Sequence, residues 1–141
     1  MAVTPFSDRL TVIDIIAADP YISSLGFKRE SIFNTSYTDE RLEKDSFQIF
    51  VFNASSNDGQ TPIYISPVIE VDISVPQAYS SRAQLAAEQI IALLQDRQLG
   101  GHTAMELIAP SPVNLPCQFG FECIGLRFRY NATLYGNIKQ I

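Results

Sequence analysis

The chain has 141 residues, of which 46% are apolar and only 18% charged, and its net charge is −5. This length fits one domain, residues 1–141, and the acidic balance argues against binding nucleic acid through a basic face. No apolar run reaches the roughly 18 residues of a membrane-spanning helix, and the first residues lack a signal-peptide pattern, so we expect neither membrane insertion nor secretion.

The first half of the chain predicts one helix and one buried strand. Apolar residues recur at helical spacing over residues 7–19, and Pro20 ends that pattern. The next residues, 21–46, have no sustained period, which indicates an exposed loop. The aromatic and β-branched run Phe47–Phe52 predicts a strand, and Asn57-Asp58-Gly59 supplies hairpin-turn residues after it.

The clearest pattern in the chain is the alternation over residues 63–75. Branched apolar residues fall on one face and mostly polar residues on the other, which predicts a strand with one face on the core and one facing solvent. Pro67 cannot donate a hydrogen bond to a ladder, so it indicates a sheet edge or a bulge. A helix is then predicted from Ser80 or Ser81 to about Gln98, before the two glycines at 100 and 101.

The last third predicts two more strands joined by a stiff connector. Residues 103–109 are a candidate short strand, and the three prolines within 110–116 indicate an extended connector. Residues 122–135 alternate between apolar and polar side chains, which predicts a long strand. The sequence therefore predicts an α+β fold in which a single mostly antiparallel sheet has helices packed on one face.

No residue pattern points to an active site, a cofactor site or a metal site. His102 follows two glycines and is expected to be a solvated turn residue, and Cys117 and Cys123 are too few to form a tetrahedral zinc site. Two buried or half-buried thiols are the expected state of the cysteines. Phosphate-binding and nucleophile-elbow motifs are absent from the sequence, so we predict no catalytic residue, no cofactor and no enzymatic activity.

Four charged residues on the polar strand faces are candidate contacts. Glu70 and Asp72 share one face of their strand, and Arg127 and Arg129 share one face of the last strand. Paired carboxylates can bind a cation or transfer protons, but they more often form the solvent face of a strand. If the two strands are neighbours, these charges form ion pairs across the strands or across a subunit boundary. We take the four as candidate subunit-interface residues, because a charge-poor surface suits a subunit that neighbours cover.

The order of these elements resembles a known family. A strand run at Pro67–Pro76 leads into the helical run Ala83–Leu94, and a proline-rich connector then leads to the strand run Gly125–Leu134. This layout resembles the tail-terminator (tail-completion) proteins of long-tailed bacteriophages, and more broadly the small neck and tail components of phages. The resemblance covers roughly Phe47–Tyr135. It rests on size and layout, and no family motif assigns a role to any single residue.

The resemblance implies a structural protein of the virion. It implies a homohexameric ring that caps the tail tube and joins it to the head-completion or connector protein, with DNA passing through the lumen without specific binding. Such a ring is assembled in the cytoplasm of the bacterial host. Two alternatives stay open. One is another neck or tail component, such as a stopper or a tube-like subunit, and the other is a non-viral, small ligand-binding α+β domain.

Overall fold

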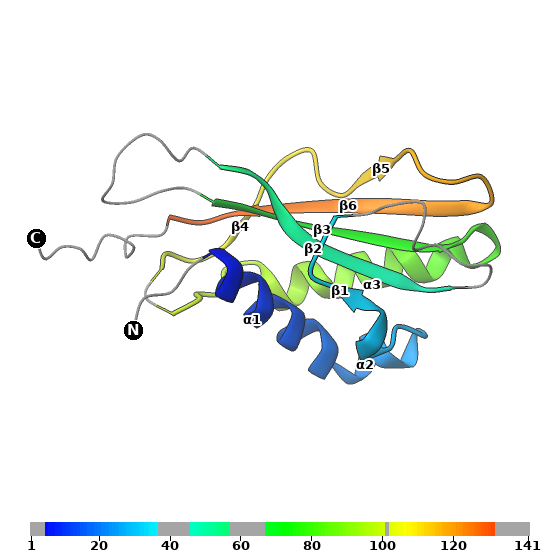
Figure 1. The fold of residues 1–141 in the computed structure, drawn as a ribbon, viewed down its shortest axis with the longest axis horizontal. Helices are drawn as coiled ribbons and strands as arrows, with labels where there is room; N and C mark the ends of the chain where they lie inside the picture. Colours follow the sequence, from blue (N-terminus) through cyan, green and yellow to red (C-terminus); the bar gives the residue numbers. More distant parts are fainter. Residues whose placement is uncertain (1–4, 37–45, 57–66, 101, 132–141) are drawn as a thin grey trace, which may run out of the picture.

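The computed structural model describes residues 5–36, 46–56, 67–100 and 102–131, which form one sheet with helices beside it (Figure 1). The helices are α1 (Pro5–Ala18), α2 (Pro20–Ser24) and α3 (Ser80–Leu94). The strands are β1 (Ile32–Phe33), β2 (Gln48–Ser56), β3 (Pro67–Pro76), β4 (Glu106–Leu107), β5 (Val113–Leu115) and β6 (Phe121–Arg129).

The strands form a single sheet in the order β1-β2-β3-β6-β4, and β5 also pairs with β6. Only the short pair β1–β2 is parallel, and the other pairs are antiparallel. The predicted α+β class with one mostly antiparallel sheet is therefore confirmed. The long strands β3 and β6, which carry the four candidate residues, are direct neighbours.

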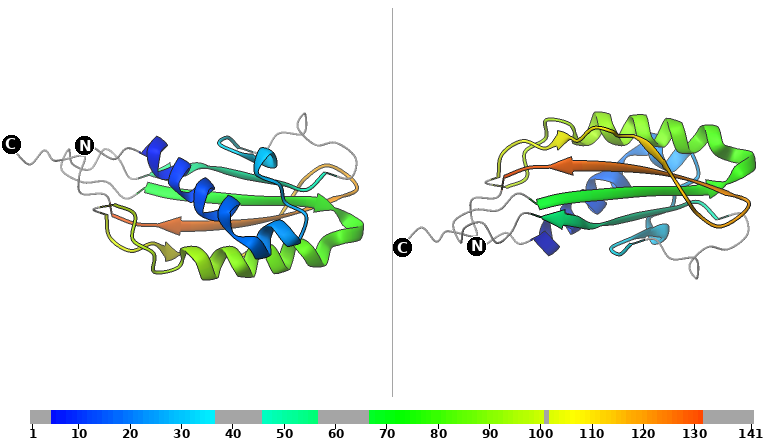
Figure 2. Two further views of the ribbon diagram at one scale, coloured as in Figure 1. Left: turned by 90° about the horizontal axis from the view of Figure 1, so that it is seen from below. Right: turned by 90° about the horizontal axis from the view of Figure 1, so that it is seen from above.

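The helices lie on one side of the sheet, and the segment that holds β5 crosses its other side (Figure 2). Helix α3 packs along β3 and β6, and α1 packs against β2. The alanines of α3 let it approach the sheet closely, since Ala83, Ala86 and Ala87 are all buried. The inward positions of the long strands complete this core, including Ile49, Val51, Ile69, Val71, Ile73, Leu126 and Phe128.

Helix boundaries follow the local chemistry of the chain. The first helix ends before Pro20 as predicted, and the side chain of Asp19 then caps α2 by accepting a hydrogen bond from the Ile22 amide at 3.0 Å. The five-residue α2 was missed because it is too short to show a period. Helix α3 ends at Leu94, earlier than predicted, because the next residues turn back to the β4 segment. There the Asp96 amide donates to the Met105 carbonyl at 2.8 Å.

The strand predictions hold where the structure describes them. Pro67 is the first residue of β3 and lies beside a register shift in β2, consistent with its missing donor. The predicted short strand is observed as β4, and the proline-rich connector is extended and contains β5. The turn Asn57-Asp58-Gly59, residues 63–66 of the predicted long strand and the end of the last strand, residues 132–135, lie outside the described residues.

The expectation of a solvent-facing side of β3 is wrong, because all ten of its residues are buried. The face away from the helices carries an aromatic pair on β1 and β2 and is crossed by the β5 segment (Figure 2). Phe33 stacks on Phe50 with ring centroids 5.3 Å apart, and the side chain of Leu115 reaches over the neighbouring strand β6. In the part of the chain that the structure describes, no helix is long and apolar enough to span a membrane.

Candidate functional site

A cluster of charged side chains lies on the covered face of the sheet, where β3 and β6 run side by side. The register sets Glu70 opposite Arg127 and Asp72 opposite Gly125. The Arg127 Nε donates to Glu70 Oε1 at 2.8 Å, which forms a cross-strand ion pair. The glutamate side chain is 8% exposed whereas the arginine side chain is 54% exposed. The buried side chain of Glu70 thus fixes the position of an arginine side chain that is exposed at the surface.

Asp72 is the most perturbed carboxyl group of this cluster. It is only 6% exposed, and its Oδ1 has no hydrogen-bond partner. Burial raises the pKa of Asp72 from 3.8 to about 9, the hydrogen bond and negative charge of Glu70 raise it further, and Arg127 lowers it. The uncharged, protonated form of Asp72 is therefore favoured at neutral pH. An uncharged carboxyl group costs less to bury than a carboxylate, which suits the buried position of Asp72.

Gly125 makes room for this network. A Cβ atom at residue 125 would lie 2.7 Å from Leu115 Cδ1, so Leu115 would have to move, and 3.1 Å from Asp72 Oδ1, which is a tight contact. The glycine thus lets Leu115 cover the carboxyl group. The close approach of β5 to the sheet depends on this one missing side chain.

Two small hollows lie on either side of Leu115. One has a volume of about 270 Å³ and is lined by Ser36, Phe52, Glu70, Asp72, Leu115, Pro116 and Cys123. The other, of about 170 Å³, is lined by Glu70, Pro110, Ser111, Val113, Leu115, Gly125 and Arg127. The larger one could accept a hydrogen-bond donor at its carboxyl groups. Its volume is below the roughly 300–1,000 Å³ of ordinary small-molecule sites.

Three of the four predicted residues come together, and the fourth does not join them. Arg129 is exposed two residues further along β6, opposite Val68 on β3 and Glu106 on β4. Sequence reasoning found the cross-strand pair but expected all four charges to be surface residues. It missed Gly125 and Leu115, whose roles depend on the pairing of β5 with β6.

The prediction that His102 is solvated is wrong. It is 1% exposed, its ring lies against Tyr130 with centroids 5.1 Å apart, and its Nε2 is 3.2 Å from Asp8 Oδ2. The Tyr130 hydroxyl donates to the same carboxylate. The adjacent Thr103 exchanges two hydrogen bonds with Asn131. Its amide donates to the Asn131 carbonyl, and its hydroxyl accepts from the Asn131 amide, so the segment that carries His102 lies against the end of β6. This junction ties α1 to the sheet.

The cysteines match the prediction of unpaired, at least half-buried thiols. Cys117 is half-buried and donates to the Phe121 carbonyl at 3.3 Å, while Cys123 is buried. Burial raises the pKa of the Cys123 thiol far above its usual range, so it stays protonated and is a poor nucleophile. Among the described residues, no group of three or more His, Cys, Asp or Glu side chains is placed to hold a metal ion.

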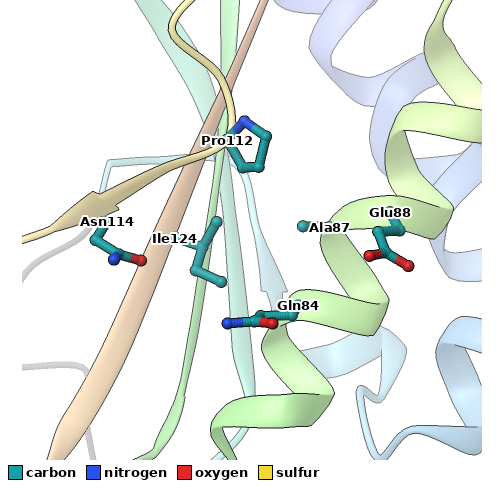
Figure 3. A pocket seen from close by; sticks show the side chains of 6 residues that line it. All are labelled: Gln84, Ala87, Glu88, Pro112, Asn114 and Ile124. Carbon is teal, nitrogen blue, oxygen red and sulfur yellow. The ribbon is translucent and has the colours of Figure 1, made fainter.

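A further hollow and an exposed aromatic ring lie elsewhere on the surface. The hollow, which we call the edge groove, lies between α3 and the β5 segment and has a volume of about 180 Å³ (Figure 3). Its lining is Gln84, Ala87, Glu88, Pro112, Asn114 and Ile124. The exposed ring is Phe119, in the turn between β5 and β6, whose exposed fraction is 98%. Sequence analysis singled out neither feature.

Comparison with known proteins gives a structural likeness without a sequence likeness. No protein-family model matches the chain, and no curated protein matches it either. Among solved structures, the fold is similar to a chain in the virion of a native gene transfer agent particle, with a TM-score of 0.66. The two share 12% sequence identity, and the match covers 92% of this chain and 98% of that chain. The match shows a shared fold.

Proposed function

We propose that this protein is a structural subunit of a phage-like virion. The observation that carries the proposal is the fold shared with a chain of a gene transfer agent virion over 98% of that chain's length. The likeness extends over nearly all of both chains, 92% of this one and 98% of that one. On this basis we treat residues 1–141 as a single domain with a non-enzymatic role.

Within such a particle, we propose the role of a tail terminator. The subunit would form a homohexameric ring that caps the tail tube and joins it to the head-completion or connector protein. A net charge of −5 favours a lumen through which DNA passes without being held. The layout of strands and helices that suggested this family is the layout observed, with the proline-rich connector placed between α3 and β6.

The charged cluster supports a contact role for two of the four candidate residues. Arg127 and Arg129 reach the surface from the same face of β6 and are available to a neighbouring subunit. Glu70 and Asp72 are buried within their own subunit, and Glu70 holds Arg127 in place by accepting its hydrogen bond. The interface proposed for these residues therefore uses the arginines directly and the carboxyl groups indirectly.

The experiment that tests the virion role looks for the protein in particles. Tailed particles produced by cells that carry the gene are purified, and the protein is quantified by mass spectrometry against the tail tube protein. Gold-labelled antibody then locates it by electron microscopy. About six copies per particle at the head-proximal end of the tail are expected for a terminator ring. Purified particles that lack the protein would contradict the virion role.

A different neck or tail component is distinguished by the same experiment. A stopper would be labelled at the head side of the neck, and a tube-like subunit would be labelled along the tail in many copies. The hollow beside Asp72 is the observation that favours a non-viral ligand-binding domain instead. That reading predicts a soluble monomer whose melting temperature rises with a small hydrogen-bond donor, and whose response is lost in Asp72→Ala.

A further inference from the structure

The larger hollow beside Leu115, which we call the carboxyl hollow, combines a polar floor with apolar walls. Its floor holds the carboxyl groups of Glu70 and Asp72, and each of these residues is 6% exposed. Its walls include the apolar side chains of Phe52, Leu115 and Pro116, and Pro116 is exposed. The hollow therefore leads from the surface to two buried carboxyl groups.

Asp72 is the floor residue that lacks a donor. The Arg127 guanidinium donates to Glu70, whereas the Oδ1 atom of Asp72 has no hydrogen-bond partner among the described residues. A buried polar atom without a partner destabilises a fold, and such atoms in native proteins often mark a bound water, ion or ligand. The Asp72 carboxyl group thus points to a hydrogen-bond donor that comes from outside the chain.

The charges of the floor favour a cation as this donor. The negative charge of Glu70 raises the pKa of Asp72 by more than the positive charge of Arg127 lowers it. An ionised Asp72 therefore needs a further positive charge beside it. A divalent metal ion needs more oxygen ligands than two carboxyl groups supply, and no group of three or more metal-binding side chains is found among the described residues.

An ammonium group on a short alkyl chain matches both parts of the hollow. The group is compact and has three N–H donors, which suits two adjacent carboxyl groups, and the alkyl chain suits the apolar walls. The volume of about 270 Å³ is below that of ordinary ligand sites, which favours a small ligand. We propose that the carboxyl hollow binds a small primary alkylammonium ion, held at its floor by Asp72 and Glu70.

Binding of this ion is coupled to the loss of a proton. Asp72 is uncharged at neutral pH, so the ion takes the place of its proton and the net charge of the hollow stays the same. Affinity is expected to rise by up to about tenfold per pH unit below the Asp72 pKa of about 9. The side chains around Asp72 come from every strand that packs beside it: Glu70 on β3, Phe50 on β2, Leu115 on β5, and Arg127 and the protonated thiol Cys123 on β6.

The test is a calorimetric titration of the purified protein with n-butylammonium chloride at pH 6, 7 and 8. The probe stays cationic over this range, because the pKa of an alkylamine is near the value of about 10.4 for lysine. Affinity is expected to rise by nearly tenfold per pH unit, with one proton released for each ion bound. Butan-1-ol has the same chain without the charge, and tetramethylammonium has the charge without an N–H group, so neither is expected to bind. Constant ionic strength keeps the general attraction of cations to a chain of net charge −5 equal in all titrations.

Two matched variants locate the binding at the hollow. Asp72→Asn keeps the shape of the side chain but cannot ionise, so it is expected to bind the probe about 10- to 100-fold more weakly at pH 8 and without the rise with pH. Asp14→Asn changes a carboxylate that is 64% exposed on α1 and is expected to bind as wild type does. Thermal melting without the probe checks that both variants are folded.

Three results overturn the inference. The first is no binding of n-butylammonium at pH 8, since the hollow then holds water only. The second is equal binding of butan-1-ol, and the third is unchanged binding by Asp72→Asn. The inference does not depend on the virion role, which the mass of the protein in solution and its presence in purified particles decide separately, so either claim can fail without the other.

Discussion

The buried carboxyl group of Asp72 predicts a definite dependence of stability on pH. Its pKa is about 9 in the folded protein and 3.8 as an exposed side chain, so between these values the folded state holds a proton that the unfolded state has lost. The stability that this proton provides is fully present below about pH 4 and is lost as pH rises toward 9. Over this range the free energy of unfolding falls by at most about 1.4 kcal/mol per pH unit, which is the limit for one proton.

Replacement of Asp72 by asparagine keeps the shape and the hydrogen-bonding capacity of the group but removes its titration. The free energy of unfolding is measured by urea denaturation of the monomer at pH 5, 6, 7 and 8. The difference in free energy of unfolding between Asp72→Asn and wild type is expected to grow in favour of the variant as pH rises. Its slope should approach about 1.4 kcal/mol per pH unit. Asp14→Asn, at a side chain that is 64% exposed, serves as the control and is expected to follow the wild-type slope. Parallel profiles for wild type and Asp72→Asn would refute the raised pKa of Asp72.

Three further changes test the packing and the contacts. Gly125→Ala places a methyl group against Leu115 and Asp72, and we expect a loss of about 1–3 kcal/mol in urea denaturation; an unchanged protein would mean that β5 does not depend on this glycine. His102→Ala leaves Asp8 buried without its ring partner, so a loss of about 3 kcal/mol is expected, whereas a solvated histidine would give less than about 0.5. Arg127→Ala leaves Glu70, whose side chain is 8% exposed, without the hydrogen bond from Arg127, so thermal melting should detect a loss of roughly 1–3 kcal/mol while self-association weakens by more; equal losses in both would make Arg127 merely structural.

The elements with strong local patterns were predictable from the sequence. The alternation in β3 and β6 and the helical spacing in α1 and α3 mark the apolar face of each segment that packs into the core, which a single segment reveals. The α+β class followed from the order of these segments. Elements with few residues, such as α2 and β1, depend on capping or on pairing with a distant strand, and a local pattern does not show either.

The site was less predictable because its properties depend on contacts between distant segments. The pairing of Glu70 with Arg127 was foreseen as one outcome of neighbouring strands. The burial of Asp72 was not, because it arises from Leu115 on a strand that pairs only with β6. His102 was misjudged for the same reason, since Asp8 and Tyr130, which contact it, come from the two ends of the described chain.

The central claim is that this chain is a ring-forming structural subunit, and its mass in solution tests that claim most directly. Light scattering behind a sizing column, over a series of protein concentrations, gives this mass. The account predicts six copies of the 15.7 kDa chain per particle, or a monomer that converts to that species as concentration rises. A monomer at every concentration would contradict self-assembly of the ring in solution.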